Sequence, residues 1–237
     1  MTDTFKPTTR HAELDGLSKR ATRVWDLPTR LFHWTLAAAV IGLIVTGLNG
    51  IMEWHFRLGY VVLSLLLFRL MWGFVGGRWS RFSAFVYAPS AVVAYLRGRA
   101  HPDHLIGHTP LGALSVFGVL AILALQVATG LVADDEIASS GPLSRFVSST
   151  VVGAATGWHQ AQGKWTVIVL VGLHVLAVLF YVLVKRHRLV RPMISGDRLG
   201  VESSAAPSRD DVASRLLALA LLAGCAGFAV WIGSLRA

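Results

Sequence analysis

Five of the nine histidines lie within or beside long apolar stretches, where burying a polar side chain is costly: His33, His55, His108, His159 and His174. His174 is the clearest case, because it has no polar neighbour in the sequence. Imidazole binds iron and other transition metals well, whereas a membrane histidine without a cofactor would hydrogen-bond to a carbonyl of another helix. The other histidines fall in tails or loops, and we expect them to contact solvent or lipid headgroups.

The spacing of His159 and His174 suits two sites at different depths. They are fifteen residues apart on one predicted helix, which gives a rise of ~22 Å and a net rotation of ~60°. Both can therefore face one bundle interior. Matching depths pair His55 with His159 and His33 with His174. By depth, His108 is a rival partner for His33, which lies close to the start of its apolar run.

Two histidines per iron would close both axial positions of a haem, which favours electron transfer over oxygen chemistry. The single cysteine, Cys225, excludes an intrachain disulfide and an iron–sulfur cluster, and the sequence has no C-x-x-C-H motif for covalent attachment of haem. Any haem is therefore expected to be bound non-covalently. Glycines could line its slot, although ordinary helix packing is an equally good role for them. The candidates are Gly42, Gly47, Gly59, Gly118, Gly130 and Gly172.

Arg69 is the one charged residue inside the apolar runs. It follows His55 by fourteen residues, so it lies ~21 Å further along the helix and ~40° from the same face. That position favours an ion pair with a haem propionate near the His33–His174 site. The alternative is an arginine that extends to the lipid headgroups. Arg30 and Arg57 are weaker candidates for the same role.

The elements that carry these residues are predicted to be transmembrane helices. Of the 237 residues, 54% are hydrophobic and 15% charged, whereas a soluble domain carries roughly 25% charged residues. Each apolar run has ~17–22 residues, enough to cross ~30 Å of hydrocarbon as a helix that satisfies its own backbone hydrogen bonds. The runs are 31–48, 58–75, 111–132, 165–184 and 216–232.

Lysine and arginine are distributed unequally around these runs. Seventeen lie on one side, in residues 1–30, 76–110 and 185–215, and four on the other. Because cytoplasmic loops accumulate positive charge, we expect a cytoplasmic N-terminus and a periplasmic C-terminus. The net charge of +9 is thus explained by membrane topology, and nucleic-acid binding is not expected.

Local signals refine the organisation. Asp26 or Thr29 can cap the first helix and Pro28 suits its first turn, so this helix is expected to begin before its apolar run. Residues 90–96 could form a helix on the cytoplasmic surface, and residues 133–158 could include a short helix. No internal repeat is evident.

Eight segments in chain order carry a resemblance to a known family: VWDLPTRLFHW (24–34), HFRLGY (55–60), FRLMWGFVGGRWSRF (68–82), GHTPLGAL (107–114), TGLVADDE (129–136), WHQAQGKW (158–165), GLHVLAVLFYVLVKR (172–186) and RPMISGD (191–197). Through them, residues 24–197 resemble the prokaryotic cytochrome b561 family, which includes the b-type cytochrome subunits of nickel–iron hydrogenases. The resemblance implies an all-α integral membrane fold, a four-helix transmembrane bundle with two non-covalent haem b groups.

Carried over by position, the resemblance implies bis-histidine ligation by His33, His55, His159 and His174. It favours the fourth helix over His108 as the source of the partner of His33, and it leaves His108 to support the site or the helix packing. The chain departs from the family in residues 1–23, a polar cytoplasmic tail, and in a linker at 198–211 followed by a fifth, C-terminal transmembrane helix at 212–237.

The predicted function is electron transfer, not catalysis, in a bacterial inner membrane. Electrons would pass between the quinone pool or a donor subunit and a periplasmic redox partner, either a c-type cytochrome or a hydrogenase-type subunit. A subunit role in a quinol-linked oxidoreductase remains open. The alternatives are a membrane anchor subunit of a redox complex and a histidine-lined proton or ion transporter without haem. Aspartate and glutamate are absent from the five runs, which argues against the transporter.

Overall fold

Five helices in the described part of the chain are long and apolar enough to cross a membrane. The computed structural model describes residues 21–137, 139–199 and 206–236. The five helices are α2 (Leu27–Leu48), α3 (Met52–Val75), α5 (Pro110–Val132), the continuous segment Ser149–Val184 and α9 (Val212–Ser234). Each contains one of the five predicted runs, so the prediction of an all-α, multi-pass membrane protein is confirmed.

The fourth span is longer than the sequence predicted. It joins α6 (Ser149–Gly157), a π-helical turn (Trp158–Gly163), α7 (Lys164–Leu179) and a second π-helical turn (Phe180–Val184) without a break. The prediction began this span at residue 165 and placed a separate short helix in the preceding loop. Residues 149–163 contain many small and polar side chains, so their hydropathy is low although their backbone is helical.

The start of α2 agrees with the predicted capping signal. The Asp26 carboxylate accepts a hydrogen bond from the Thr29 backbone N–H (2.8 Å), and Pro28 lies in the first turn. The helix therefore begins four residues before the apolar run, which places His33 in its second turn. Asp26 is fully buried and also accepts a hydrogen bond from Trp72 Nε1 (3.2 Å), so it joins the start of α2 to the end of α3.

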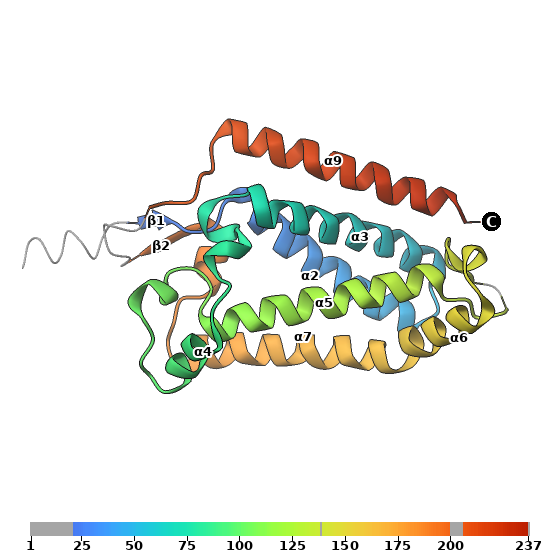
Figure 1. Cartoon of the computed structure of the whole chain (residues 1–237), viewed down its shortest axis with the longest axis horizontal. Coiled ribbons are helices and arrows are strands. Elements are labelled where there is room, and N and C mark those ends of the chain that lie inside the picture. The colour runs from blue at the N-terminus through green and yellow to red at the C-terminus, as the bar shows by residue number, and fades with distance from the viewer. Residues whose placement is uncertain (1–20, 138, 200–205, 237) are drawn as a thin grey trace, which may run out of the picture.

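The spans form a bundle in which α3 has the most neighbours (Figure 1). It packs against α2, α5 and α9, and α5 in turn packs against α7. The backbones of α2 and α7 are not closely packed. Buried side chains between α2 and α3 form the main core, including Phe32, Leu36, Val62, Phe68 and Trp72. The α2–α7 side of the bundle is therefore left open.

Short elements connect the spans, most of them at the end of the bundle where the described chain begins; the 3₁₀ turn Ser144–Phe146 lies at the other end. β1 (Ala21–Arg23) pairs antiparallel with β2 (Asp197–Leu199), with Ala21 opposite Leu199. α8 (Val190–Ser195) precedes β2, and α4 (Pro89–Leu96) is the helix predicted at residues 90–96. The 3₁₀ turns are Arg78–Ser80, Phe82–Ala84, Pro102–Leu105 and Ser144–Phe146.

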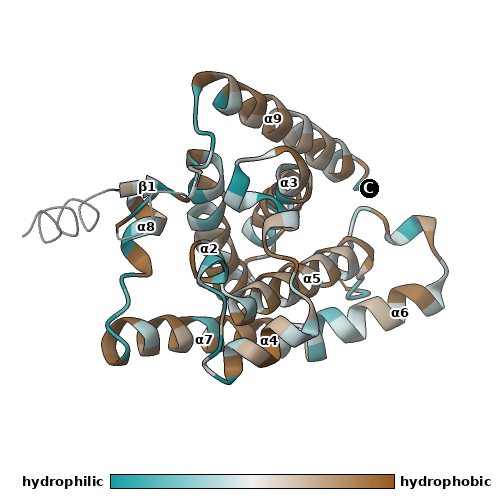
Figure 2. Ribbon diagram, turned by 60° about the vertical axis from the view of Figure 1, so that its left-hand side comes forward, coloured by the Kyte–Doolittle hydropathy of each residue, from teal (hydrophilic) through white to brown (hydrophobic). Residues whose placement is uncertain are grey.

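The described chain starts and finishes at opposite ends of the bundle, with β1 at one end and the C-terminal end of α9 at the other (Figure 1). Hydrophobic residues dominate α5 and α9, whereas the segments around β1 and between α7 and α8 carry hydrophilic residues (Figure 2). Ends of the described chain on opposite sides agree with an odd number of crossings. The hydropathy agrees with polar connections that lie outside the lipid.

The segment before α9 is bound to the rest of the fold. Ser208 Oγ donates a hydrogen bond to the Val24 carbonyl (2.7 Å), and Asp210 forms an ion pair with Arg23 (2.5 Å). Along the helix, the Cys225 sulfur lies 3.9 Å from the Met71 sulfur of α3. The fifth helix is therefore packed against the core. Of the predicted tail and linker, residues 1–20 and 200–205 lie outside the described residues.

Candidate functional site

The structure brings four of the predicted histidines together in two pairs. His33 of α2 faces His174 of α7 with ring centres 6.4 Å apart, and His55 of α3 faces His159 of the first π-helical turn at 6.1 Å. His159 and His174 belong to one continuous helix, which separates the pairs by ~22 Å along the bundle. The molecule thus holds two imidazole pairs at two depths.

The spacing within each pair fits one metal ion between the rings. Imidazole nitrogen–metal bonds are ~2 Å long, so two imidazoles on opposite sides of one metal ion have ring centres ~6.3 Å apart. Both observed separations agree with this value. Val167 is the one buried residue of α7, and His174 is exposed. The donor set and spacing at each pair therefore fit a metal ion bound by two imidazoles, as the iron of a haem would be.

Hydrogen bonds orient the two rings of the His55–His159 pair. Nδ1 of His55 lies 3.1 Å from the Leu43 carbonyl oxygen, and Nδ1 of His159 lies 2.9 Å from the Gln126 carbonyl oxygen. A carbonyl can only accept, so each Nδ1 carries the proton and donates it. Each Nε2 is then unprotonated and free to bind a metal.

Two glycines of the predicted slot touch these rings. A Cβ at Gly47 would lie 3.1 Å from Cε1 of His55, and one at Gly130 would lie 2.6 Å from Cε1 of His159. Gly42 instead packs against Leu58 of α3, as the helix-packing alternative predicted. At the remaining candidates, Gly59, Gly118 and Gly172, an added Cβ would meet no atom of the described residues within 4 Å. The close glycines therefore make room for imidazole rings.

Gln126 holds the π-helical turn that carries His159, a role the sequence analysis missed. Its side-chain Nε2 donates a hydrogen bond to the His159 carbonyl (2.9 Å), while its own carbonyl accepts from His159 Nδ1. A π-helical turn shifts the backbone pairing by one residue, which frees a carbonyl for such a contact, and these turns are frequent at functional sites. The sequence signal for this role was that Gln126 is a polar residue within the apolar run 111–132.

The His33–His174 end has buried polar atoms that lack partners. Nδ1 of His33, Nη1 of Arg69 and Nδ1 of His108 are buried and have no hydrogen-bond partner within the described residues. Such atoms are costly unless a ligand or water satisfies them. Their presence at this end is consistent with an anionic, hydrogen-bond-accepting group there, as haem propionates would be.

Arg69 is buried, with 3% of its surface exposed, so it does not extend to the lipid headgroups. Its guanidinium stacks on the Phe82 ring at 4.7 Å and lies 5.9 Å from the Phe85 ring. The two weaker candidates differ from each other. Arg57 is exposed and paired with Glu53, whereas Nε of Arg30 is buried without a partner in the described chain.

His108 lies beside the His33–His174 pair and does not face His33. Its ring contacts Trp25 at 4.6 Å and Phe85 at 4.3 Å. Burial, together with the nearby guanidinium of Arg69, lowers the pKa of His108 to about 3. His108 is therefore neutral, and the structure places His174 rather than His108 opposite His33.

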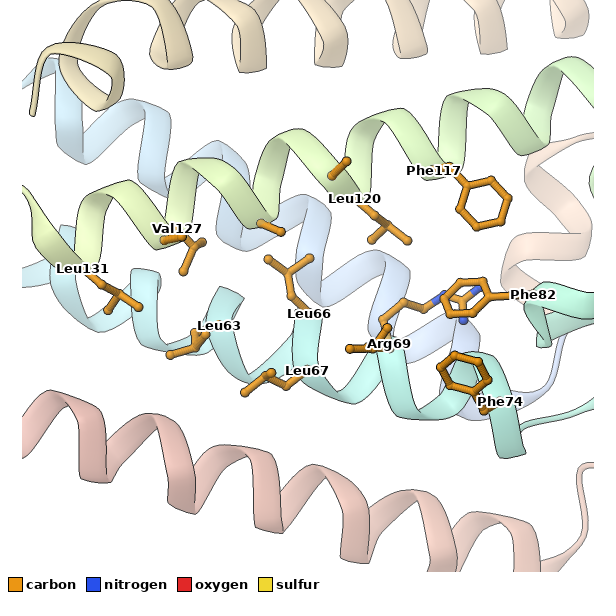
Figure 3. Close-up of a pocket in the computed structure, with 14 residues that line it drawn as sticks. Leu63, Leu66, Leu67, Arg69, Phe74, Phe82, Phe117, Leu120, Val127 and Leu131 are labelled. Carbon is orange, nitrogen blue, oxygen red and sulfur yellow. The ribbon is translucent and has the colours of Figure 1, made fainter. Parts of the chain in front are cut away.

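A groove of about 480 Å³ runs between α3 and α5 (Figure 3). Its walls are aliphatic, and Arg69 is the one charged residue among the described side chains that line it. Aromatic rings gather at the Arg69 end of the groove: Phe74, Phe82 and Phe117 (Figure 3). The groove can therefore take a slender apolar molecule.

The family model described as prokaryotic cytochrome b561 matches residues 24–196. The chain belongs to the prokaryotic cytochrome b561 family. The predicted resemblance is thus confirmed, over the region that contains all four paired histidines. As a member of this family the chain is a multi-pass membrane cytochrome of the b type, and it takes part in electron transport rather than catalysing a reaction itself.

Curated relatives extend over most of the cytochrome b561 chain. A "Probable Ni/Fe-hydrogenase B-type cytochrome subunit" of Cupriavidus necator is 28% identical over 222 residues, covering 79% of this chain and 91% of the relative. The protein of that name from Azotobacter chroococcum is 29% identical, covering 76% and 89%. A "Probable Ni/Fe-hydrogenase 1 B-type cytochrome subunit" of Escherichia coli K12 is 25% identical, covering 74% and 89%. No solved structure matches the chain.

Proposed function

We propose that this b561-family cytochrome carries two haem b groups, each held by two histidines, and conducts electrons across a bacterial inner membrane. The observation that carries the proposal is the presence of two histidine pairs, at 6.1 and 6.4 Å, at two depths of one bundle. The proposed core is residues 24–197, preceded by the tail 1–23. After the core, the proposed segments of the chain are the linker 198–211 and the fifth helix 212–237.

Each side chain has a defined part in this proposal. His55 and His159 would hold one haem, and His33 and His174 would hold the other. Arg69 pairs with a propionate of the second haem, and neutral His108 offers a further polar contact there. A bound haem supplies a one-electron couple, its iron alternating between the ferric and ferrous states. Because both axial positions are filled by histidine, substrates cannot bind at iron.

The proposed orientation places the N-terminus in the cytoplasm and the C-terminus in the periplasm. Among the described residues, most lysines and arginines belong to segments 21–30, 76–110, 185–199 and 206–215, which we assign to the cytoplasmic side by the positive-inside rule. The His55–His159 pair is then near the periplasm. We propose that a periplasmic partner, either a hydrogenase-type redox subunit or a c-type cytochrome, exchanges electrons at this end.

The groove between α3 and α5 suits the quinone pool as the other redox partner. It is apolar along its length, as the isoprenoid tail of a quinone requires, and Arg69 lies at its aromatic end. Replacing Ala124 in the groove wall with tryptophan should slow haem reduction by a short-chain quinol and leave the haem content unchanged. Ala213→Trp, at an exposed position of α9, is the matched control.

The decisive experiment counts haem and follows electrons. The purified full chain should give two b-type haems by the pyridine haemochrome assay and two one-electron components in a potentiometric titration. In vesicles loaded with ferricyanide, external dithionite should bleach the trapped ferricyanide only when both haems are present. Two haems without transmembrane bleaching would overturn the conduction proposal. No haem, in cells supplied with haem, would favour the anchor or transporter function instead.

A further inference from the structure

The triplet Thr-Gly-Leu occurs near the ends of two spans, at residues 46–48 of α2 and 129–131 of α5. In each case the glycine touches an imidazole of the next span, His55 or His159. In each case Nδ1 of that imidazole bonds to the carbonyl three residues before the threonine. The two ends of the His55–His159 pair are thus built in the same way.

The threonine hydroxyls also act alike. Thr46 Oγ1 donates to the Gly42 carbonyl (2.7 Å) and Thr129 Oγ1 donates to the Leu125 carbonyl (2.8 Å), each one turn back on its own helix. Such bonds keep the hydroxyl against the helix, where it leaves room for the neighbouring ring. Thr46 Oγ1 additionally lies 3.3 Å from Nδ1 of His55, so this imidazole has a second polar neighbour.

We propose that Thr46–Gly47 and Thr129–Gly130 are two equivalent seats that position the ligands of the His55–His159 haem and lower its reduction potential. The inference rests on the proposed bis-histidine function. Each seat lets a ring lie against bare helix backbone and fixes its Nδ1 proton on a carbonyl. Each Nε2 is thereby left without a proton and available as a ligand.

The electronic effect follows from the Nδ1 hydrogen bond. Donation to a carbonyl makes the imidazole more basic, and a more basic ligand stabilises ferric iron over ferrous iron. His33 has no such acceptor for Nδ1 among the described residues, and the positive charge of Arg69 lies at that end. The His55–His159 haem is therefore the component of lower potential, which makes electron flow from this haem to the other favourable.

The test uses steric and electronic variants with controls. Gly130→Ala should lose the His55–His159 haem, because its Cβ would lie 2.6 Å from the ring, whereas Gly47→Ala, at 3.1 Å, should retain the haem with a raised potential. Thr46→Val preserves volume and should raise the lower potential alone. Gly224→Ala and Gly227→Ala in α9, where a Cβ would meet no atom within 4 Å, are the controls. Haem content, redox titration and the electron paramagnetic resonance of ferric haem are measured.

The outcomes separate this inference from the proposed function. If the wild-type chain holds two haems but Thr46→Val and Gly47→Ala match the controls in both potentials and spectra, the seats are structural only and the inference is overturned. The same holds if these variants move the higher potential. If the wild-type chain holds fewer than two haems, the proposed function itself fails. If the Gly130→Ala variant does not accumulate in the membrane, the reduction potentials of Thr46→Val and Gly47→Ala still test the inference.

Discussion

His33 and His174 face each other at 6.4 Å although α2 and α7, the helices that carry them, are not closely packed. Side chains alone bridge this side of the bundle. The pair is consequently the place where a cofactor would contribute most to holding α7 against the rest of the protein, and it is the most informative pair to disrupt.

Replacing His174 with alanine should remove one haem per chain and leave the other. The remaining haem should keep the lower reduction potential, because the His55–His159 pair and its hydrogen bonds are ~22 Å away along the helix. Haem content and a redox titration of the purified variant measure both effects. His187→Ala, in an exposed segment, is the control. An unchanged haem content in the His174 variant would contradict the assignment.

Replacing Arg69 with leucine should lower the potential of the His33–His174 haem. A positive charge near a haem favours the reduced form, so its loss shifts the equilibrium by ~1–2 kcal/mol, or roughly 40–90 mV for a one-electron couple. The titration should show one component moving and the other fixed. Arg57→Leu removes an exposed arginine and should change neither. Identical titrations for both variants would leave Arg69 without a role at the haem.

Replacing Asp26 with alanine should destabilise the cytochrome by about 2–4 kcal/mol. Its buried carboxylate accepts hydrogen bonds from Thr29 N, Trp72 Nε1, Gly77 N and Ser80 Oγ, and these donors would lose their acceptor. Loss of haem absorbance on heating in detergent reports the change. Asp103→Ala, at an exposed carboxylate, should melt like the wild type. Equal melting of the two variants would show that Asp26 is dispensable.

The attachment of α9 should weaken in acid. Burial tends to raise the pKa of Asp210, but hydrogen bonds from Arg215 and Arg23 outweigh it and lower that pKa below its ordinary value of 3.8. A lowered pKa gives stability that is complete above 3.8 and is lost as the pH falls through the folded value. The readout is thermal unfolding of the detergent-solubilised chain, followed by circular dichroism between pH 7 and pH 3.

Asp210→Asn should abolish this pH dependence and cost ~1 kcal/mol at neutral pH. The unfolding temperature of the variant should then be lower than that of the parent at pH 7 and should fall less below pH 4. Glu53→Gln breaks an exposed ion pair at the other end of the bundle and should behave like the parent. An Asp210 variant with the pH profile of the parent would mean that the ion pair does not hold α9.

Local properties of the sequence were enough for the spans and for five candidate histidines, whereas the family resemblance favoured the fourth helix over His108. Long apolar runs predict transmembrane helices because lipid leaves no other partner for the backbone. His174 is recognisable without a structure, since an imidazole within such a run needs a reason to be there. The spacing of His159 and His174 along one helix also predicts two depths, because helical rise is constant. The capping role of Asp26 follows from its immediate neighbours.

Contacts between distant segments decided the rest. That Gly47 and Gly130, but not Gly118, touch a histidine ring depends on how α2, α3 and α5 pack, which no local pattern encodes. The burial of Arg69 required knowledge of Phe82, a loop residue that covers it. The repeated Thr-Gly-Leu triplet can be read in the sequence, but its contact with a histidine of another helix is seen only in the structure. Hydropathy indicates whether a segment lies in lipid or in water. Tertiary packing determines which side chains contact each other.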